Sequence, residues 1–287
     1  QMCIRDRNRT CVIIVKVIEE RFVFSRKEFI HMGRIITIAN QKGGVGKTTT
    51  AINLSACLAE AGQHVMLVDF DPQGNASSGL GLEQEDFDKT VYDMMIEEAS
   101  VDECIIKEIQ PNLDVLPSDM NLAGAEIEFQ EVEDKEKLLN SCLNQVRDTY
   151  DFIIIDCPPS LNILTINALT AADTVLVPIQ CEYYALEGLN QVLKTVDLVK
   201  RKLNPELELE GVVFTMYDAR TNLSLEVVES VKSSLNRTIY KTIIPRNVRL
   251  AEAPSHGMSI NLYDSRSTGA ESYRMLAAEV MSRGEEL

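Results

Sequence analysis

The sequence has few of the features that mark disulfide-bonded, membrane-spanning or metal-binding proteins. Its seven cysteines include no C-x-x-C pair, a pattern typical of scattered reduced thiols in a cytoplasmic protein. No apolar run approaches the roughly 20 residues that a membrane-spanning helix needs. The three histidines, His31, His64 and His256, lie far apart in the chain and suggest no shared metal site. These absences favour a globular cytoplasmic protein.

Positive charge is also scarce. The chain holds 28 Lys and Arg against 44 Asp and Glu, which gives a formal net charge of −16 and argues at first against a nucleic-acid partner. The acidic excess lies in residues 32–210, whereas residues 211–287 hold as many basic as acidic residues. A local basic face in the last third is therefore compatible with the composition. The alternative is an acidic protein without a polyanionic partner.

Residues 1–31 differ from the rest of the chain, because basic residues exceed acidic ones there. Thr10–Val17 is apolar enough to suggest a strand, but no small-residue cleavage site follows it as in a signal peptide. The run Met2–Arg7 resembles translated sequencing-adapter sequence, and a buried strand is predicted directly after Met32. We therefore expect residues 1–31 to be a non-native or disordered extension and residues 32–287 to form a single domain.

From Met32 on, continuous Val, Ile and Leu runs alternate with helical patterns. Such runs are typical of strands covered on both faces, and their alternation with helices predicts a doubly wound, mainly parallel α/β sheet flanked by helices. The predicted strands are Ile35–Ala39, Val65–Asp69, Leu113–Leu116, Phe152–Asp156, Thr174–Ile179, Val212–Met216 and Ile239–Ile244. The predicted helices are Lys47–Ala61, Asp134–Arg147, Leu161–Ala171, Ala185–Leu203, Leu223–Leu235 and Gly269–Arg283.

A glycine-rich turn between the first predicted strand and the first helix has the context of a phosphate-binding loop. Its glycines let successive N–H groups point at one anion, and the helix N-terminus adds its dipole. Lys47 would neutralise the β and γ phosphates, and the Thr48 hydroxyl would bind Mg²⁺. Gln41 stands where the usual first glycine belongs, and a second lysine follows it, as in the deviant Walker A motif. The predicted ATP-binding residues of this loop are Lys42, Gly43, Gly44, Val45, Gly46, Lys47, Thr48 and Thr49.

Carboxylates follow two further buried strands. Asp69 and Asp156 each end a strand, and Asp71 lies in the loop beyond Asp69. Ligands of open α/β sheets bind beyond the carboxyl ends of the strands, so all three acids can approach a nucleotide. We expect Asp156 to hold Mg²⁺ directly or through water and Asp71 to bind the metal and orient the attacking water. Asp69 either joins the metal shell or fixes the loop.

With these motifs in place, the sequence is similar to the ParA/Soj family of chromosome- and plasmid-partitioning ATPases. The similarity covers essentially all of residues 32–287, and the motifs occur in the family's order. They are Asn40–Thr50, Asp69–Asn75, Asp156–Ser160, Pro245–Leu250 and Glu252–Ser255.

The resemblance implies an ATP-bound sandwich dimer with Mg²⁺, in which Lys42 reaches the partner subunit's phosphates. It makes Lys42, Lys47 and Asp71 the catalytic residues. It also implies that the dimer binds DNA without sequence preference through Arg220 and Arg249, so the protein would be cytoplasmic and nucleoid-associated without a membrane partner. A ParB-like centromere-binding protein would stimulate hydrolysis. The adenine-side residues implied by the resemblance are Met216, Pro245, Arg246 and Asn247.

Three alternatives make different demands on the sequence. A MinD-like membrane-cycling ATPase would end in a basic amphipathic helix, whereas residues 277–287 are short and acidic. A nitrogenase-iron-protein-like reductase needs paired cysteine ligands for an iron–sulfur cluster, which these cysteines do not provide. A nucleotide-gated switch that hardly hydrolyses ATP is the third alternative, and the presence of Lys47, Asp71 and Asp156 favours hydrolysis instead.

Overall fold

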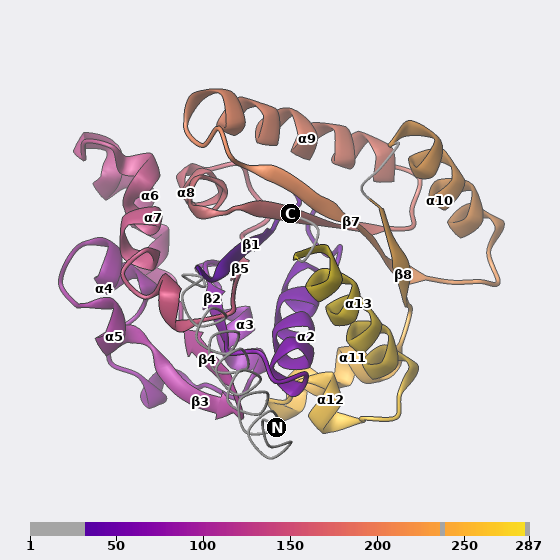
Figure 1. Ribbon diagram of the computed structural model, residues 1–287, viewed down its shortest axis with the longest axis horizontal. Helices are drawn as coiled ribbons and strands as arrows, with labels where there is room; N and C mark the ends of the chain where they lie inside the picture. The colour runs from indigo at the N-terminus through magenta and orange to yellow at the C-terminus, as the bar shows by residue number, and fades with distance from the viewer. Residues whose placement is uncertain (1–31, 236–238, 285–287) are drawn as a thin grey trace, which may run out of the picture. The chain divides into compact units, whose positions relative to one another are not determined.

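The computed structural model describes residues 32–235 and 239–284 (Figure 1). The described residues from Gly33 onward belong to one compact unit. The expectations for residues 1–31, including the strand over Thr10–Val17, lie outside the described residues. Within the described ranges, no helix is long and apolar enough to cross a membrane.

An eight-stranded sheet runs through the described part of the chain in the order β3-β4-β2-β5-β1-β6-β7-β8. All neighbouring strands are parallel except the edge pair β3–β4, which is antiparallel. The predicted doubly wound, mainly parallel α/β fold is thus confirmed. The strands are β1 (Arg34–Ile38), β2 (Val65–Asp69), β3 (Ile106–Gln110), β4 (Leu113–Leu116), β5 (Phe152–Asp156), β6 (Thr174–Gln180), β7 (Glu208–Tyr217) and β8 (Ile239–Pro245).

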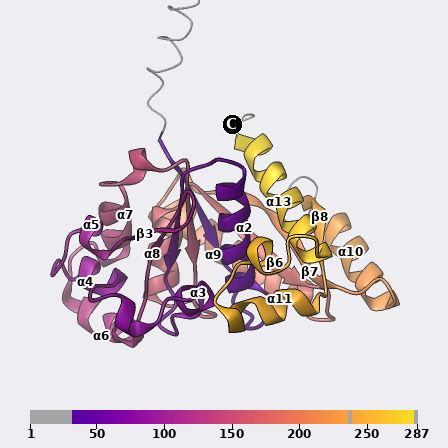
Figure 2. The ribbon, with the colours of Figure 1, turned by 90° about the horizontal axis from the view of Figure 1, so that it is seen from below.

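Helices cover both faces of this sheet, as Figures 1 and 2 show from two directions. One face carries α4 to α10, and the other carries α2, α3 and α11 to α13. Their bounds are α2 (Lys47–Glu60), α3 (Asn75–Gly79), α4 (Val91–Met95), α5 (Val101–Cys104), α6 (Ala125–Glu128), α7 (Leu138–Leu143), α8 (Ile163–Ala171), α9 (Ala185–Lys202), α10 (Asn222–Ser234), α11 (Val248–Glu252), α12 (Ile260–Tyr263) and α13 (Thr268–Gly284).

The strand sequences explain why two cores form. Successive side chains of a strand point to opposite faces. In β5, Ile153 and Ile155 enter the core under α8 and α9, whereas Phe152 and Ile154 enter the core under α2 and α13. Because both faces are covered, the strand is a continuous apolar run rather than an alternating one.

One expected helix was wrong, and several elements, among them β3 and the short helices α3 to α6, α11 and α12, were not predicted. The single helix predicted over Asp134–Arg147 is a 3-10 turn at Lys135–Lys137 followed by the short helix α7, because Asp134 takes a left-handed φ of 54° and Asn144 caps the end of α7. Asn and Asp favour helix ends over helix interiors. Strand β3 was not predicted at all, since its Lys107 and Glu108 are exposed at the edge of the sheet and interrupt any apolar pattern.

The register of the central strands determines where the functional residues meet. Asp69 of β2 lies opposite Asp156 of β5, and Ile38 at the end of β1 lies opposite the same Asp156. The glycine-rich loop that follows β1 therefore begins at the same edge of the sheet as both carboxylates.

Candidate active site

The glycine-rich loop joins β1 to α2 in a conformation that requires glycine at two positions. Gly44 and Gly46 take left-handed φ values of 73° and 87°, which strain residues with a Cβ. The loop is anchored at both ends. The Asn40 side chain accepts from Lys42 N at 3.0 Å and donates to the Pro178 carbonyl at 2.8 Å. A matching bond runs from the Thr215 hydroxyl to the Val45 carbonyl at 2.8 Å.

Lys47 opens α2, and its side chain turns back into the loop. The residue is 7% exposed, and its Nζ donates to the Lys42 carbonyl at 3.3 Å. Burial lowers the pKa of Lys47, while the nearby carboxylate of Asp156 opposes that shift. A bound phosphate would supply the negative charge that keeps this buried ammonium protonated.

Asp156 is the most unusual group of the site. Its side chain is fully buried, and in the described part of the chain neither carboxylate oxygen has a hydrogen-bond partner of normal geometry. Burial, together with the charge of Asp69, raises the pKa of Asp156 well above its usual value, and the facing Thr48 hydroxyl offsets this only in part. Buried carboxylates without partners are rare and costly. An oxygen-seeking cation or its water shell would satisfy both oxygens, so Thr48 and Asp156 fit Mg²⁺.

Asp69 has a different role from its neighbours. One of its oxygens accepts from both the backbone N–H and the hydroxyl of Ser77 at 2.8 Å, and the other accepts from Asp71 N at 3.3 Å. Burial raises the pKa of Asp69 to about 6, although these hydrogen bonds favour its ionised form. Asp69 therefore fixes the turn into α3, the second of the two roles that the sequence allowed.

Asp71 begins the loop that Asp69 holds in place. It is 7% exposed, and its Oδ1 accepts from Gln73 N at 3.0 Å. Its charge acts on both Lys47 and Asp156, so the three groups lie within electrostatic reach of one another. Among the described residues, no three His, Cys, Asp or Glu side chains form a metal cluster by themselves.

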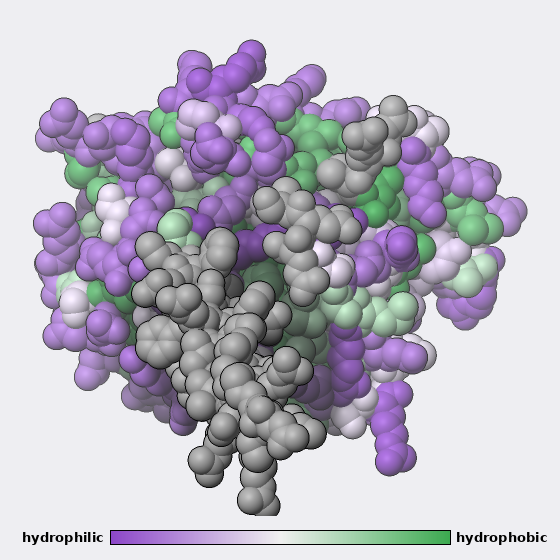
Figure 3. Space-filling model, viewed as in Figure 1, coloured by the Kyte–Doolittle hydropathy of each residue, from purple (hydrophilic) through white to green (hydrophobic). Residues whose placement is uncertain are grey.

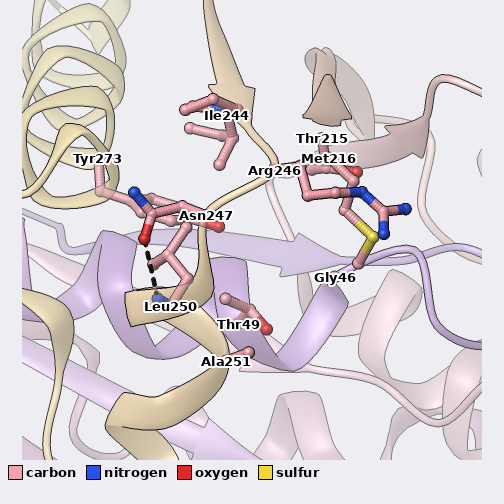
Figure 4. Close-up of a pocket in the computed structure, with 11 residues that line it drawn as sticks. Gly46, Thr49, Thr215, Met216, Ile244, Arg246, Asn247, Leu250, Ala251 and Tyr273 are labelled. Atoms are coloured by element: carbon pink, nitrogen blue, oxygen red, sulfur yellow. Dashed lines mark hydrogen bonds between the residues drawn. The ribbon is translucent and has the colours of Figure 1, made fainter. Parts of the chain in front are cut away.

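A pocket of about 210 Å³ lies on the other side of the loop (Figure 4). Figure 4 shows Met216 and Arg246 on one side of it and Asn247, Leu250 and Tyr273 on the other. The Asn247 side chain accepts from the backbone N of Leu250 at 3.3 Å, which ties the end of β8 to α11. The pocket is lined by Gly46, Thr49, Thr215, Met216, Ile244, Pro245, Arg246, Asn247, Leu250, Ala251 and Tyr273.

The pocket contains each of the adenine-side residues that the resemblance implied, and others that the sequence did not reveal. Tyr273 comes from α13, far along the chain, and its hydroxyl lies 3.1 Å from that of Thr50 in α2. Helical periodicity predicts that α13 packs on the sheet, but not that it packs against the helix of the phosphate loop. Two further pocket residues lie in segments that the resemblance pointed to: Thr215, directly before Met216, and Leu250, within the motif Pro245–Leu250.

Lys42 does not turn toward the buried cluster. Its Nζ lies 2.7 Å from Glu182 Oε2, in the turn between β6 and α9, and both side chains are partly exposed. The neighbouring glycines Gly43 and Gly44 are exposed as well. Lys42 is thus on the outer surface of the phosphate loop, held by an acid of the same chain.

The two arginines implied for DNA binding follow β7 and β8 at the same edge of the sheet. Arg220 is exposed and makes a two-pronged ion pair with Asp218, with distances of 2.9 and 2.7 Å, which keeps the pKa of Asp218 below its usual value. Arg249 in α11 pairs with Glu252 at 2.9 Å and with Asp264 at 3.5 Å. Both guanidinium groups are therefore oriented by acids that also reduce their net charge.

Comparison with known proteins shows to which family this chain belongs. Residues 33–209 match a family model described as an AAA domain. The chain is 58% identical to the sporulation initiation inhibitor protein Soj of Bacillus subtilis over 253 residues, covering 88% of this chain and 100% of Soj. It is 51% identical to the chromosome partitioning protein ParA of Myxococcus xanthus, covering 88% of this chain and 89% of ParA.

The chain belongs to the ParA/Soj family of chromosome-partitioning ATPases. A solved structure of cobyrinic acid a,c-diamide synthase from Mycobacterium smegmatis, with a bound ATP analogue and magnesium, has a similar fold. It superposes with a TM-score of 0.78 at 34% identity, covering 88% of this chain and 96% of that one. Membership in the ParA/Soj family confirms the resemblance that the sequence motifs indicated.

Proposed function

We propose that this ParA/Soj-type ATPase binds ATP and Mg²⁺ between its phosphate loop and the pocket around Met216. The main support for the proposal is the buried Asp156 carboxylate, whose oxygens have no hydrogen-bond partner of normal geometry among the described residues and lie beside Thr48 and Lys47. In this arrangement Lys47 binds the β and γ phosphates and Asp71 orients the attacking water. When bound, the cation neutralises the charge that develops on the phosphates. The residues proposed to bind ATP are Lys42 to Thr49 together with Met216, Pro245, Arg246 and Asn247.

The ATP-bound state is proposed to be a homodimer that brings two nucleotide sites face to face. Lys42 supports this idea, because its side chain lies on the exposed side of the loop, where it pairs with Glu182. A lysine in that place can neutralise phosphates of a second subunit once it leaves Glu182. The ion pair between Lys42 and Glu182 is partly exposed, so breaking it costs little.

We further propose that the dimer binds DNA without sequence preference. Arg220 and Arg249 stand at the ends of β7 and β8, in the part of the chain where acidic and basic residues balance. Dimerisation doubles these basic groups. Binding of this kind rests on phosphate contacts and the release of counterions, so it is weak per subunit and sensitive to salt. A ParB-like partner is proposed to stimulate hydrolysis and thereby release the DNA.

Membrane cycling of the MinD type is the alternative function. The balance of charge in residues 211–287 does not distinguish a DNA backbone from an anionic membrane as the ligand. Co-sedimentation with anionic vesicles in ATP would favour the membrane, whereas co-sedimentation that is equal with and without ATP would count against it.

The dimer is tested by measuring the molar mass in solution with Mg²⁺ and a non-hydrolysable ATP analogue. We expect the unaltered chain to be a dimer with the analogue and a monomer with ADP, and Lys42→Ala to stay a monomer in both. Lys89→Ala is the matched control, because Lys89 is also a partly exposed lysine in an ion pair with an acid of its own chain. Dimerisation of Lys42→Ala to the same extent as the control would contradict the proposed role of Lys42.

A further inference from the structure

The turn between β7 and α10 holds a carboxylate directly against one of the two arginines proposed to bind DNA. Arg220 Nε and Nη2 donate to the two carboxylate oxygens of Asp218 at 2.9 and 2.7 Å, and the backbone N of Arg220 donates to the first of these oxygens at 3.0 Å. A DNA phosphate presents its oxygens to a guanidinium with the same two-pronged geometry. Asp218 and a DNA phosphate therefore compete for the same donors.

Asp218 is held by the fold, whereas Arg220 projects into solvent. The side chain of Arg220 is 86% exposed, against 22% for that of Asp218. The Asp218 carbonyl accepts from the backbone N and the hydroxyl of Thr221 at 3.1 and 3.0 Å, directly before α10 begins. The arginine is therefore the part of the pair that can turn toward a phosphate. A phosphate bound to Arg220 then lies close to a fixed negative charge.

The segment that leads into this turn is fixed to the nucleotide site. The Thr215 hydroxyl donates to a carbonyl of the phosphate loop at 2.8 Å, and the Tyr217 carbonyl accepts from the backbone N of Arg246 at 2.9 Å. Between them, Met216 takes a left-handed φ of 50°, which is uncommon for a residue with a Cβ. Arg246 lines the nucleotide pocket, and its charge also acts on Asp218. The position of Asp218 is therefore set by the strand that borders the nucleotide pocket.

We propose that Asp218 is a positioning residue that limits the affinity of this chain for DNA. It holds the Arg220 guanidinium in the free chain and competes with DNA phosphates for it. Each subunit then binds DNA weakly, so DNA is released readily once the subunits separate. Because a dimer carries two copies of the pair on one duplex, the effect of Asp218 on DNA affinity multiplies in the dimer. This inference rests on the proposed function, because it takes Arg220 to contact DNA.

The test measures the DNA affinity of the full chain and of Asp218→Asn, with ADP and with a non-hydrolysable ATP analogue. Asparagine keeps an oxygen for the backbone N of Arg220 but removes the charge that holds the guanidinium. We expect the affinity to rise about threefold with ADP and about ninefold with the analogue, because the gains of two subunits multiply on one duplex. The slope of log affinity against log salt concentration should become steeper, because each released guanidinium neutralises a phosphate more completely.

Glu208→Gln is the matched control. Glu208 is the first residue of β7, at the opposite end of the strand that leads to Asp218, and its side chain pairs with Lys200 and is 62% exposed. The variant removes one negative charge from an ion pair, as Asp218→Asn does, but away from the proposed DNA surface. Because salt screens charges over such a separation, its DNA affinity and salt slope should match those of the unaltered chain.

A double-mutant cycle shows whether Asp218 acts through Arg220. Asp218→Asn should raise DNA affinity less in the Arg220→Ala background, where no guanidinium remains to be released. An equal gain in both backgrounds would overturn the proposal, because the carboxylate would then only repel DNA. Unchanged or lower affinity of Asp218→Asn would overturn it as well, while DNA binding by the unaltered chain would leave the proposed function in place. Failure of the unaltered chain to bind DNA in any nucleotide state would overturn the proposed function, and this inference with it.

Discussion

At the scale of single residues, the site combines charged groups whose burial is unfavourable for each of them alone. Asp156 is a buried carboxylate that has no hydrogen bond of normal geometry within residues 32–235 and 239–284, and Lys47 is a buried ammonium. Each is stabilised by what a nucleotide with its cation would bring. The ligand-free chain is therefore destabilised at the residues that are proposed to bind ATP and Mg²⁺.

Asp156→Asn should separate stability from function. The amide carries no charge to desolvate, so we expect the ligand-free variant to gain about 1–3 kcal/mol in its free energy of unfolding at pH 7.5. The pKa of Asp156 is raised in the folded chain. The ionised side chain therefore lowers the free energy of unfolding above that pKa, and this loss vanishes below the pKa that Asp156 has in the unfolded chain. The gain should therefore shrink as the pH falls. Urea unfolding at several pH values measures it, and a less stable variant at pH 7.5 would contradict the prediction.

Asp69 gives a second pH dependence with the same sign. Its pKa rises from 3.8 to about 6 on folding, so the folded chain binds the extra proton between these values. Stability contributed by this group is present at low pH and falls as the pH rises from about 4 to about 6. Asp69→Asn should flatten this part of the profile. Thermal unfolding between about pH 4 and pH 7.5 tests it, and identical slopes for both proteins between about pH 4 and 6 would show that the folded pKa of Asp69 is not raised.

Asp71→Ala tests the chemistry of hydrolysis. Loss of the group that orients water should lower the hydrolysis rate by about 100-fold or more, while binding of ATP continues. The variant should accumulate as an ATP-bound dimer on DNA. Phosphate release and DNA retention measured on the same sample check both points, and undiminished hydrolysis would exclude Asp71 from this role.

At the scale of elements, α13 connects the starting ends of β1 and β7 with the nucleotide pocket. Glu210 of β7 is buried, pairs with Arg34 and accepts from the Tyr240 hydroxyl at 2.7 Å, while Arg283 of α13 donates to the Glu210 carbonyl at 2.6 Å. Arg34 also reaches the end of α13, donating to the Val280 carbonyl. This network holds the helix that places Tyr273 in the pocket.

Glu210→Ala should weaken both the fold and nucleotide binding. It leaves Arg34 without its ion-pair partner in a mostly buried site, which costs about 3–5 kcal/mol in the free energy of unfolding. Because α13 also lines the pocket, the affinity for ATP should fall in the same variant. Glu210→Gln keeps hydrogen bonding and should be destabilised less. Equal stability of the unaltered chain and Glu210→Ala in urea would refute the anchoring role.

Elements also show how far the sequence could predict the structure. Buried strands such as Phe152–Asp156 were predicted at the correct residues, because burial on both faces produces a continuous apolar run. β3 was missed because an exposed edge strand carries little hydrophobic pattern. At the site, the motifs predicted the phosphate loop and its carboxylates, but the contact of Tyr273 with Thr50 and the ion pair of Lys42 with Glu182 depend on tertiary packing.

At the scale of the whole molecule, charge is distributed unevenly. On the face that Figure 3 shows, the visible coloured surface is mostly hydrophilic and is interrupted by small hydrophobic areas. The net charge of −16 opposes binding to DNA. The proposed DNA binding therefore depends on a dimer, which carries two copies of Arg220 and Arg249.

Arg249→Ala tests this dependence on a few arginines. The variant should bind DNA more weakly whatever the DNA sequence, because the arginine is proposed to neutralise a backbone phosphate. The slope of log affinity against log salt concentration should become shallower by about one for each phosphate that is no longer neutralised. ATP binding should stay unchanged, and a parallel decrease in ATP binding would contradict this role.

ATP-gated DNA binding is tested by measuring the DNA affinity of the unaltered chain with ATP, with ADP and without nucleotide, each across a salt series. ATP-driven dimerisation should tighten binding by about 100-fold over the other two states, because two sets of arginines then act on one duplex. The ATP state should also show the steepest dependence on salt. Equal affinity and equal salt dependence in all three states would contradict ATP-gated DNA binding.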